Sequence, residues 1–202
     1  MSSATATDGR RLRGDASRRA VMRIAVDQAS VEGLEGLSIG SLAAAASMSK
    51  GGIATLFGSK EQLQLATVAA ASDIFIASVI TPALEVKGGR ARLSALLDGW
   101  LRYSESRVFA GGCFFFAASA ELGSKPGPVR DAVARALRDW HEFLRRTILR
   151  AVERGELDEG TDAAQLAFEI TSLLDGANAQ SRLFDSAEPY ARARTALAAH
   201  LD

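Results

Sequence analysis

The sequence of 202 residues predicts an all-α fold of about nine helices. Three observations carry this prediction. Apolar residues recur at spacings of three and four over most of the chain, no stretch shows the sustained alternation that is typical of strands, and alanine and leucine outnumber the β-branched residues. Glycine and proline residues between the periodic segments then mark the expected helix ends.

Serine, aspartate and glycine residues divide the N-terminal part. Residues 1–14 are polar and basic, have no apolar periodicity, and are expected to form a flexible arm. Asp15 is suited to cap a first helix that ends near Val31, because an aspartate side chain accepts hydrogen bonds from free N–H groups of the first turn. Ser38, Ser49 and Ser59 are suited to cap three further helices for the same reason.

Two short helices and a long one follow from these signals. The segment 39–46 has apolar residues at helical spacing, and residues 50–57 form the next short helix. The long helix is expected to stop near Thr81-Pro82, because proline lacks the N–H that a helix interior needs. We therefore expect an N-terminal three-helix domain over residues 15–60.

The remaining residues, 61–202, are expected to form a C-terminal helical bundle. Glycines and prolines divide the part after the long helix into five helices, of which the third has the cleanest apolar stripe. The expected segments are the helix after Gly88-Gly89 that carries Leu93 to Leu101, then 113–122, 129–152, 162–184 and 188–201.

Charge is unevenly distributed, although the formal net charge is zero. Residues 10–60 contain eight basic side chains against four acidic ones. Such a local excess indicates a polyanionic partner for the N-terminal part, because phosphate neutralisation needs cations gathered on one surface. The same excess also fits a solvated arm without a partner.

The single cysteine, Cys113, lies among glycine and phenylalanine residues, a setting typical of a small core residue. One cysteine excludes an intramolecular disulfide and fits a reducing cytoplasm. The N-terminus lacks the apolar stretch of a signal peptide, and the most apolar run, residues 63–80, is interrupted by Asp73. We therefore expect a cytoplasmic protein without a membrane partner.

Histidine is scarce, and His141 and His200 are its two occurrences. Neither lies beside a nucleophile or at a metal-ligand spacing, and no glycine-rich phosphate loop follows a strand. The sequence therefore gives no support for an enzyme, for catalytic or metal-binding residues, or for a cofactor.

Residues 33–63 have the pattern of a helix-turn-helix. Such a motif needs two helices packed across a turn of three or four residues, the second short enough to lie in a DNA major groove. Leu42 and Ala46 are placed to pack on Ile53 and Phe57, and residues 47–49 make the turn. The start of the second helix then presents free N–H groups to an anionic ligand.

This stretch resembles the TetR family over residues 15–63. The resemblance rests on a series of short elements in register, which is a more specific signal than one isolated motif. The elements are Glu32-Gly33, Leu37-Ser38-Ile39, Leu42-Ala43, Met48-Ser49-Lys50-Gly51, Phe57 and Ser59-Lys60-Glu61 to Leu63.

The resemblance implies a partner, double-stranded DNA with a palindromic operator, and a set of contact residues. Side chains before and within the second helix of the motif would face the groove, and basic residues around it would contact phosphates or the minor groove. The implied DNA-binding residues are Arg18, Arg19, Ser38, Ser49, Lys50, Gly51, Thr55 and Lys60, with Arg10, Arg11 and Arg13 of the arm as further candidates.

Two positions depart from the family pattern. Ala54 replaces a common aromatic residue and Leu56 a common histidine, and both family residues lie on the DNA face. The tandem Gly51-Gly52 also weakens the helix, by about 1 kcal/mol for each glycine relative to alanine. We expect weaker DNA binding or greater dependence on the arm. A degenerate helical ligand-binding protein that has lost specific DNA recognition is the alternative.

Beyond residue 81 the resemblance is weaker, and it implies a cavity for a small-molecule effector whose identity the sequence does not specify. Cavities in helical bundles are lined by apolar side chains with a few polar ones. Each candidate also fits a role in the core, and for Asp175 and Asn178 a solvent-facing or dimer position is the alternative. The candidates are Trp100, Tyr103, Cys113, Phe116, Trp140, Phe143, Phe168, Asp175 and Asn178.

The resemblance also implies a homodimer that forms through the last two helices. Two recognition helices about 34–36 Å apart read a palindrome, and one alone reads few base pairs. An effector that favours a wrongly spaced conformation would release the DNA, with the helix from Ser59 to Thr81 as the connecting lever. The expected dimer residues are Leu166, Ile170, Leu173, Leu174 and Ala177.

Overall fold

The computed structural model describes residues 3–201, with side chains from residue 16, and this part of the chain is helical without a strand. Because α4, a π-helical turn and α5 follow one another without a break, the described residues form nine helical rods, as the sequence predicts. The elements are α1 (Ser3–Glu32), α2 (Ile39–Ala45), α3 (Lys50–Phe57), α4 (Lys60–Phe75), the π turn (Ile76–Ile80), α5 (Thr81–Leu84), α6 (Arg90–Glu105), α7 (Phe114–Leu122), α8 (Pro128–Glu153), α9 (Ala163–Phe184) and α10 (Glu188–Ala199).

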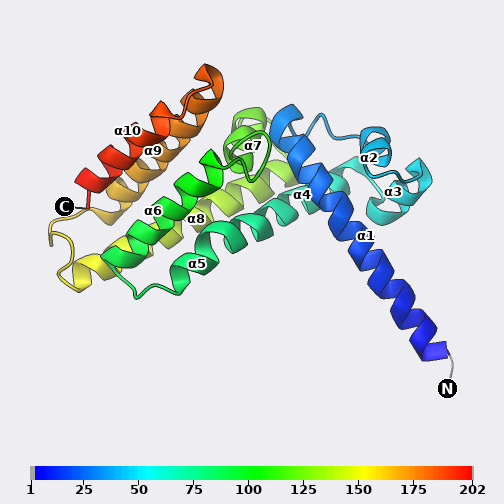
Figure 1. Cartoon of the computed structure of the whole chain (residues 1–202), viewed down its shortest axis with the longest axis horizontal. Helices are drawn as coiled ribbons and strands as arrows, with labels where there is room; N and C mark the ends of the chain where they lie inside the picture. Colours follow the sequence, from blue (N-terminus) through cyan, green and yellow to red (C-terminus); the bar gives the residue numbers. More distant parts are fainter. Residues whose placement is uncertain (1–2, 202) are drawn as a thin grey trace.

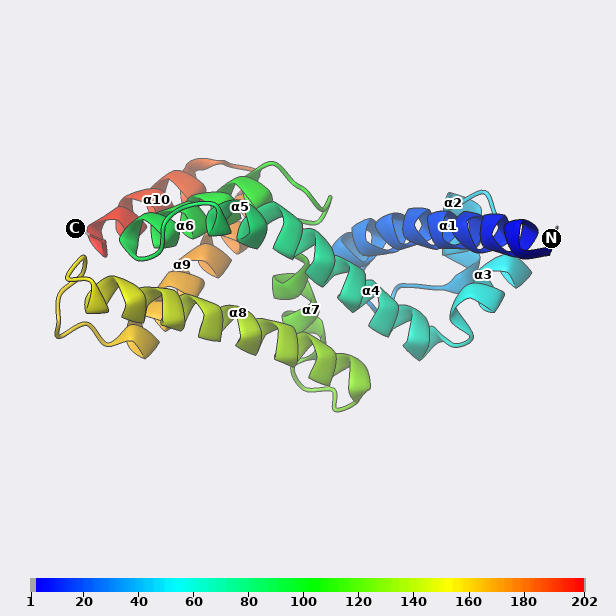
Figure 2. The same cartoon turned by 90° about the horizontal axis from the view of Figure 1, so that it is seen from below.

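The rods form two groups along an elongated molecule (Figure 1). The first, which we call the head, contains α1, α2 and α3. The second, which we call the body, contains α6 to α10. Figure 2 shows α4 running from the head into the body, so this helix belongs to both groups.

α1 begins at Ser3 and not at the predicted Asp15. The preceding segment contains no proline, and its alanine and arginine residues are strong helix formers, so Gly9 and Gly14 do not end the helix. The N-terminal part of α1, which begins at Ser3, therefore extends away from the body (Figure 1). The side chains of Arg10, Arg11 and Arg13 lie outside the described residues.

Serine side chains cap the three helices that follow, as predicted. Ser38 Oγ accepts a hydrogen bond from Ser41 N at 3.0 Å, and Ser41 Oγ accepts one from Ser38 N in return. Ser49 Oγ accepts from the N–H of Gly52 at 3.0 Å, and Ser59 Oγ from that of Gln62 at 3.1 Å. These bonds fix where α2, α3 and α4 begin.

The rod of residues 60–84 passes the predicted stop at Pro82 and ends at Leu84. It turns through a π-helical segment directly before Pro82, where the N–H of Thr81 donates to Ile76 O. By length and composition this rod could cross a membrane. Its buried face, which includes Leu63 and Phe75, instead packs in the core between α1 and α8.

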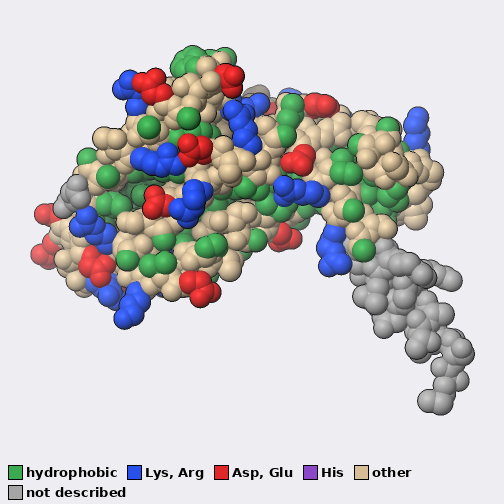
Figure 3. Space-filling model, in the orientation of Figure 1, with side chains coloured by type: hydrophobic (Ala, Val, Ile, Leu, Met, Phe, Trp, Pro, Cys, Tyr) green, Lys and Arg blue, Asp and Glu red, His purple; other side chains and the backbone are tan. Residues whose placement is uncertain are grey.

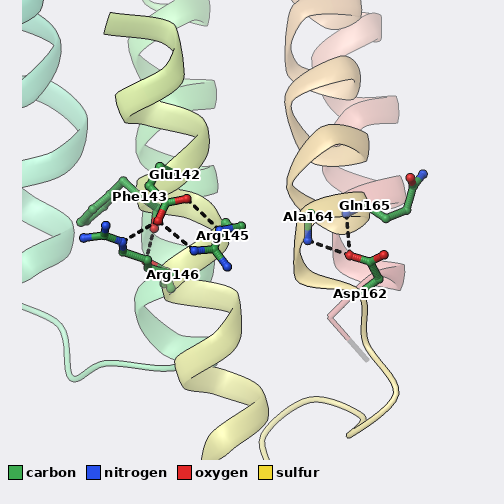
Figure 4. Close-up of polar contacts among 8 residues, drawn as sticks. Glu142, Phe143, Arg145, Arg146, Asp162, Ala164 and Gln165 are labelled. Atoms are coloured by element: carbon green, nitrogen blue, oxygen red, sulfur yellow. Dashed lines mark hydrogen bonds and ion pairs between the residues drawn. The ribbon is translucent and has the colours of Figure 1, made fainter. Parts of the chain in front are cut away.

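In the body, α8 and α9 are stabilised by local polar contacts (Figure 4). Arg145 and Arg146 donate to the Glu142 carboxylate at 2.7 and 2.6 Å, and these hydrogen bonds lower the pKa of Glu142 to about 2. Asp162 Oδ1 accepts from the backbone N–H groups of Ala164 and Gln165 in the first turn of α9 and so caps that helix. Figure 3 shows acidic and basic side chains interspersed over the body, as on an ordinary solvated surface.

Four of the five predicted dimer residues lie in the core of the protomer. Leu166, Ile170, Leu174 and Ala177 are buried by neighbouring helices of the same chain, and Leu173 is half-buried. α9 carries apolar residues on more than one side, so its sequence pattern did not distinguish the inner face from the outer one. Its large exposed apolar side chains are Phe168, Leu183 and Phe184.

Candidate functional site: a DNA-binding head joined to an apolar cavity

α3 has an inner and an outer face. Ile53 and Phe57 are buried against the rest of the head, which confirms their predicted packing role. Lys50, Gly51 and Thr55 are exposed on the opposite side. A Cβ placed on Gly51 would meet no heavy atom within 4 Å, so the surface there is open to close approach by a ligand.

Thr55 and Ser49 use their hydroxyl groups within the helix. Thr55 Oγ1 donates to Gly51 O at 2.8 Å, and Ser49 Oγ accepts the capping hydrogen bond. Each hydroxyl oxygen keeps further capacity for a hydrogen bond to a ligand. Lys50 is the exposed cation of α3, and it follows directly on the N-cap.

Two of the basic residues predicted to flank the motif, Arg18 and Lys60, hold its parts together. Arg18 Nη1 donates to Leu56 O at 2.6 Å, and its guanidinium carbon lies 4.8 Å from the centroid of the Phe57 ring. Lys60 Nζ donates to Glu35 O at 2.7 Å and lies 3.5 Å from Glu35 Oε2. Both cations are exposed, so these bonds leave them close to the surface where a phosphate would bind.

Leu56 packs toward the core, whereas Arg19 is exposed to solvent. Leu56 is half-buried and packs against the hydrophobic core, which gives this residue a packing role where the family commonly has a histidine. Ala54 is also half-buried. Arg19 is exposed on α1 beside Arg18.

The Glu121 carboxylate joins the head to the body, a contact that sequence reasoning missed. Glu121, at the end of α7, accepts hydrogen bonds from the backbone N–H groups of Leu34 and Glu35, at 2.7 and 2.8 Å. Both donors lie in the loop between α1 and α2. Gly33 has a φ of 82°, and a Cβ there would lie 2.7 Å from Glu121 Oε2, so glycine makes room for the carboxylate. Gln64 of α4 donates to Leu34 O at 2.9 Å and holds the same loop.

A second junction lies at the loop between α6 and α7. Gly111 N donates to Ser30 Oγ at 2.8 Å, and a Cβ on Gly111 would lie 1.8 Å from Ser30 O. Arg182 of α9 donates to Gly111 O, and Arg23 of α1 donates to Val108 O at 2.8 Å. The loop thus contacts the head through α1 and the body through α9.

A cavity of about 370 Å³ lies in the body, within the size range of small-molecule sites. Residues from α4, the π turn, α6, α7, α8 and α9 line it. Six of the nine predicted residues are among them, namely Trp100, Cys113, Phe116, Trp140, Phe143 and Asp175.

The other three predicted residues lie elsewhere. Phe168 is 63% exposed on the outer side of α9. Tyr103 is buried with its ring 5.4 Å from that of Phe75, and burial raises the pKa of its hydroxyl. Asn178 is fully buried, and its Oδ1 accepts from Ser104 Oγ at 3.1 Å and from Cys113 N at 2.9 Å. Asn178 thus ties α9 to α6 and to the start of α7.

Sequence reasoning missed the part of the lining that the long rod supplies. Phe75, Ile76 and Ile80 line the cavity, and the last two belong to the π turn. The π turn interrupts the regular helix where it borders the cavity, a position at which such turns are frequent in functional sites. Nothing in the local sequence distinguished these residues from ordinary core residues of a connecting helix.

Burial shifts the pKa values of two ionisable groups in the lining. Burial raises the pKa of Cys113 to about 12, so its sulfur is a neutral thiol at neutral pH, which fits the small buried residue that the sequence predicts. Burial also raises the pKa of the Asp175 carboxyl to about 6. Asp175 is therefore mostly ionised at neutral pH and becomes neutral in mild acid.

Several solved structures share this architecture. A TetR transcriptional regulator from Chloroflexus aurantiacus is 29% identical, and the match covers 93% of this chain and 94% of that one with a TM-score of 0.82. A TetR-family regulator from Agrobacterium tumefaciens is 17% identical over 94% of this chain and 100% of that one, with a TM-score of 0.83. AibR, solved in complex with isovaleryl coenzyme A and operator DNA, is 21% identical over 80% of this chain and 85% of that one, with a TM-score of 0.67. No curated protein matches the chain.

A helix-turn-helix head joined to an apolar cavity defines a class of helical transcriptional regulators. The family model of the tetracyclin repressor-like C-terminal domain matches residues 89–197, more than half of the chain. The chain belongs to the TetR family of transcriptional regulators.

Proposed function

We propose that the protein is a cytoplasmic, homodimeric repressor that binds a palindromic operator through α3 and releases it when a small molecule occupies the cavity. The observation that carries this proposal is that α7 reaches from the cavity to the head. Phe115 and Phe116 near its start line the cavity, and Glu121 near its end holds the α1–α2 loop of the head. A ligand that displaces α7 therefore acts on the position of α3.

The proposed dimer contact is the outer side of α9 with α10. Phe168 and Leu183 are 63% and 79% exposed and lie on one side of α9, because fifteen residues advance a helix by about four turns. Small residues lie between them on that side, and α10 exposes Ala191 and Ala198. Two copies of such a face bury their apolar side chains against each other in a four-helix contact.

The experiment that tests the proposal is selection of bound sequences from a random pool of duplex DNA by the full-length protein at near-physiological salt. Enrichment of a palindrome with half-sites about one helical turn apart supports the operator-binding dimer. Salt-sensitive binding without an enriched sequence supports the alternative, a ligand-binding protein that has lost operator recognition, for which Ala54 and Leu56 are the motivating observations.

The Lys50→Ala variant is expected to bind the selected operator more weakly and with a smaller dependence on salt. If Lys50 contacts one phosphate, its loss lowers the slope of log affinity against log salt by about one per half-site. Fluorescence anisotropy with labelled operator at several salt concentrations measures both effects. Lys87→Ala, which removes an exposed lysine between α5 and α6, is the matched control. An unchanged slope in Lys50→Ala contradicts a phosphate contact.

The Glu121→Gln variant is expected to loosen the head from the body. An amide oxygen accepts at one position of the carboxylate, but the NH₂ group that replaces the second oxygen cannot accept from the other backbone N–H. A lost hydrogen bond to a charged group costs about 1.5–3 kcal/mol. Hydrogen exchange at the amides of Leu34 and Glu35 should therefore become faster. Glu159→Gln, an exposed loop variant, should leave these amides unchanged, and equal protection in both variants would count against the clamp.

A further inference from the structure

The cavity contains a carboxylate that has no counter-ion. Asp175 lies on the wall that α9 contributes, together with Thr171 and Leu174. Within residues 16–201 the Asp175 carboxylate makes no hydrogen bond and no ion pair. Asp175 is half-buried, and an ionised carboxylate that loses part of its hydration without a charged partner weakens a fold, so such groups are often paired or serve a ligand.

The charged groups on the other walls do not neutralise Asp175. α4, the π turn and α6 contribute no ionisable side chain to the lining, and the loop before α7 contributes the neutral thiol of Cys113. α8 contributes Arg135, Asp139 and His141, all exposed to solvent. Partial desolvation lowers the pKa of His141, so its ring is mostly neutral at neutral pH. The inside of the cavity therefore carries a negative charge.

The exposed lining residues show where the cavity opens. On one side these are Ala69 of α4 and Ile76 of the π turn, and on the other they are Arg135, Asp139 and His141 of α8. The mouth, as we call this opening, thus lies between α4 and α8, whereas Asp175 is half-buried on α9. A ligand that enters between α4 and α8 can direct one end toward Asp175.

Aromatic rings surround the space that such a ligand would fill. The Phe75 ring lies 5.2 Å from that of Trp140 and 6.2 Å from that of Phe115, both at steep angles, and Trp100 is a further member of the lining. The faces of aromatic rings attract cations, most strongly where water is excluded. The lining as a whole is apolar, so the remainder of the ligand should be hydrocarbon or aromatic.

We infer that the effector is a lipophilic organic cation, an amine whose protonated nitrogen pairs with Asp175 while its apolar part packs between Trp100, Trp140 and Phe115. This inference rests on the proposed function only in treating the cavity as the effector site. The carboxylate selects a positive charge, and the apolar walls select the hydrophobic remainder. An anion of the same shape would face Asp175 without a buried cation to offset the repulsion.

The test compares three eight-carbon probes that differ in their charged end: octylammonium, octanol and octanoate. Both tryptophans of the chain line the cavity, so intrinsic fluorescence of the full-length protein reports their binding directly. At pH 7.5 we expect octylammonium to bind at least tenfold more tightly than octanol, and octanoate to bind more weakly than either. Octanol or octanoate binding as tightly as octylammonium overturns the inference.

Two further arms identify the group responsible. In Asp175→Asn the tenfold preference for octylammonium over octanol should disappear while octanol still binds, whereas Asp139→Asn at the mouth should keep the preference. In the unaltered protein, octylammonium affinity should fall about tenfold between pH 7.5 and pH 5, because a carboxyl with a pKa of about 6 becomes protonated. Octanol affinity should stay constant, and the same fall in His141→Gln excludes the histidine at the mouth as its source.

The test of the effector class can fail while the test of the proposed DNA-binding function succeeds, so the two outcomes can be told apart. Selection of an operator tests DNA recognition without any of these probes, so a palindrome can be enriched even when octylammonium shows no preference. A preference for octylammonium that Asp175→Asn retains, or an affinity that does not change with pH, overturns the assignment of Asp175.

Discussion

Replacing Phe168 and Leu183 together by lysine is expected to separate the protomers and to lower operator affinity at least about 100-fold, because two linked half-site contacts gain avidity of about that size. These side chains are large, apolar and exposed in the protomer. In the proposed dimer each substitution occurs twice, so four ammonium groups would be buried in one apolar contact. Sedimentation velocity measures the mass, and anisotropy with labelled operator measures the affinity.

Leu84→Lys provides a matched control for this pair. Leu84 is 48% exposed at the end of α5, which packs on α6 and the π turn, so a lysine there should change neither mass nor affinity. A dimeric mass for the Phe168 and Leu183 double variant would show that the protomers associate through a different surface.

Gly111→Ala should unfold the junction between head and body and abolish operator binding. The added Cβ would lie 1.8 Å from Ser30 O and 2.8 Å from Ser30 Oγ, so the α6–α7 loop must move away from α1. That movement breaks the hydrogen bond from Gly111 N to Ser30 Oγ. Overpacking against backbone of this kind costs about 3 kcal/mol or more. Urea denaturation followed by circular dichroism should show a midpoint lowered accordingly.

A second glycine variant tests whether this cost comes from the contact or from the loss of glycine itself. A Cβ on Gly88 would meet only the end of the Arg92 side chain, at 3.9 Å, so Gly88→Ala should be close to neutral. An equally mild effect in Gly111→Ala would mean that the loop can move away from Ser30 without weakening the junction.

The helix boundaries were predictable because they depend on local chemistry. Ser38, Ser49 and Ser59 accept hydrogen bonds from residues three positions ahead, and a sequence displays that spacing directly. Proline and glycine residues predicted the helix ends less accurately. Pro82 did not stop the rod of residues 60–84, because the π turn before it changes the hydrogen bonding, and Gly9 and Gly14 did not delay the start of α1.

The site was predictable where one element carries it. The exposed residues of α3 follow from the helix-turn-helix pattern, and the tryptophans of the cavity follow from their size and spacing. Contacts between distant segments were not predictable. Glu121 binds the N–H groups of residues 34 and 35, more than eighty positions earlier, and nothing around Glu121 in the sequence points to them. The orientation of Phe168 likewise depends on which sides of α9 its neighbours cover.

The Glu121 contact also bears on how such a regulator diversifies. A hydrogen bond from a backbone N–H group to a carboxylate does not depend on the side chain of the donor residue, and every residue except proline has this donor. Substitutions on the outer face of α3 therefore leave the coupling to α7 intact. In the proposed mechanism, operator preference could therefore change, or be exchanged by grafting recognition residues from a relative, while the response to the effector is kept.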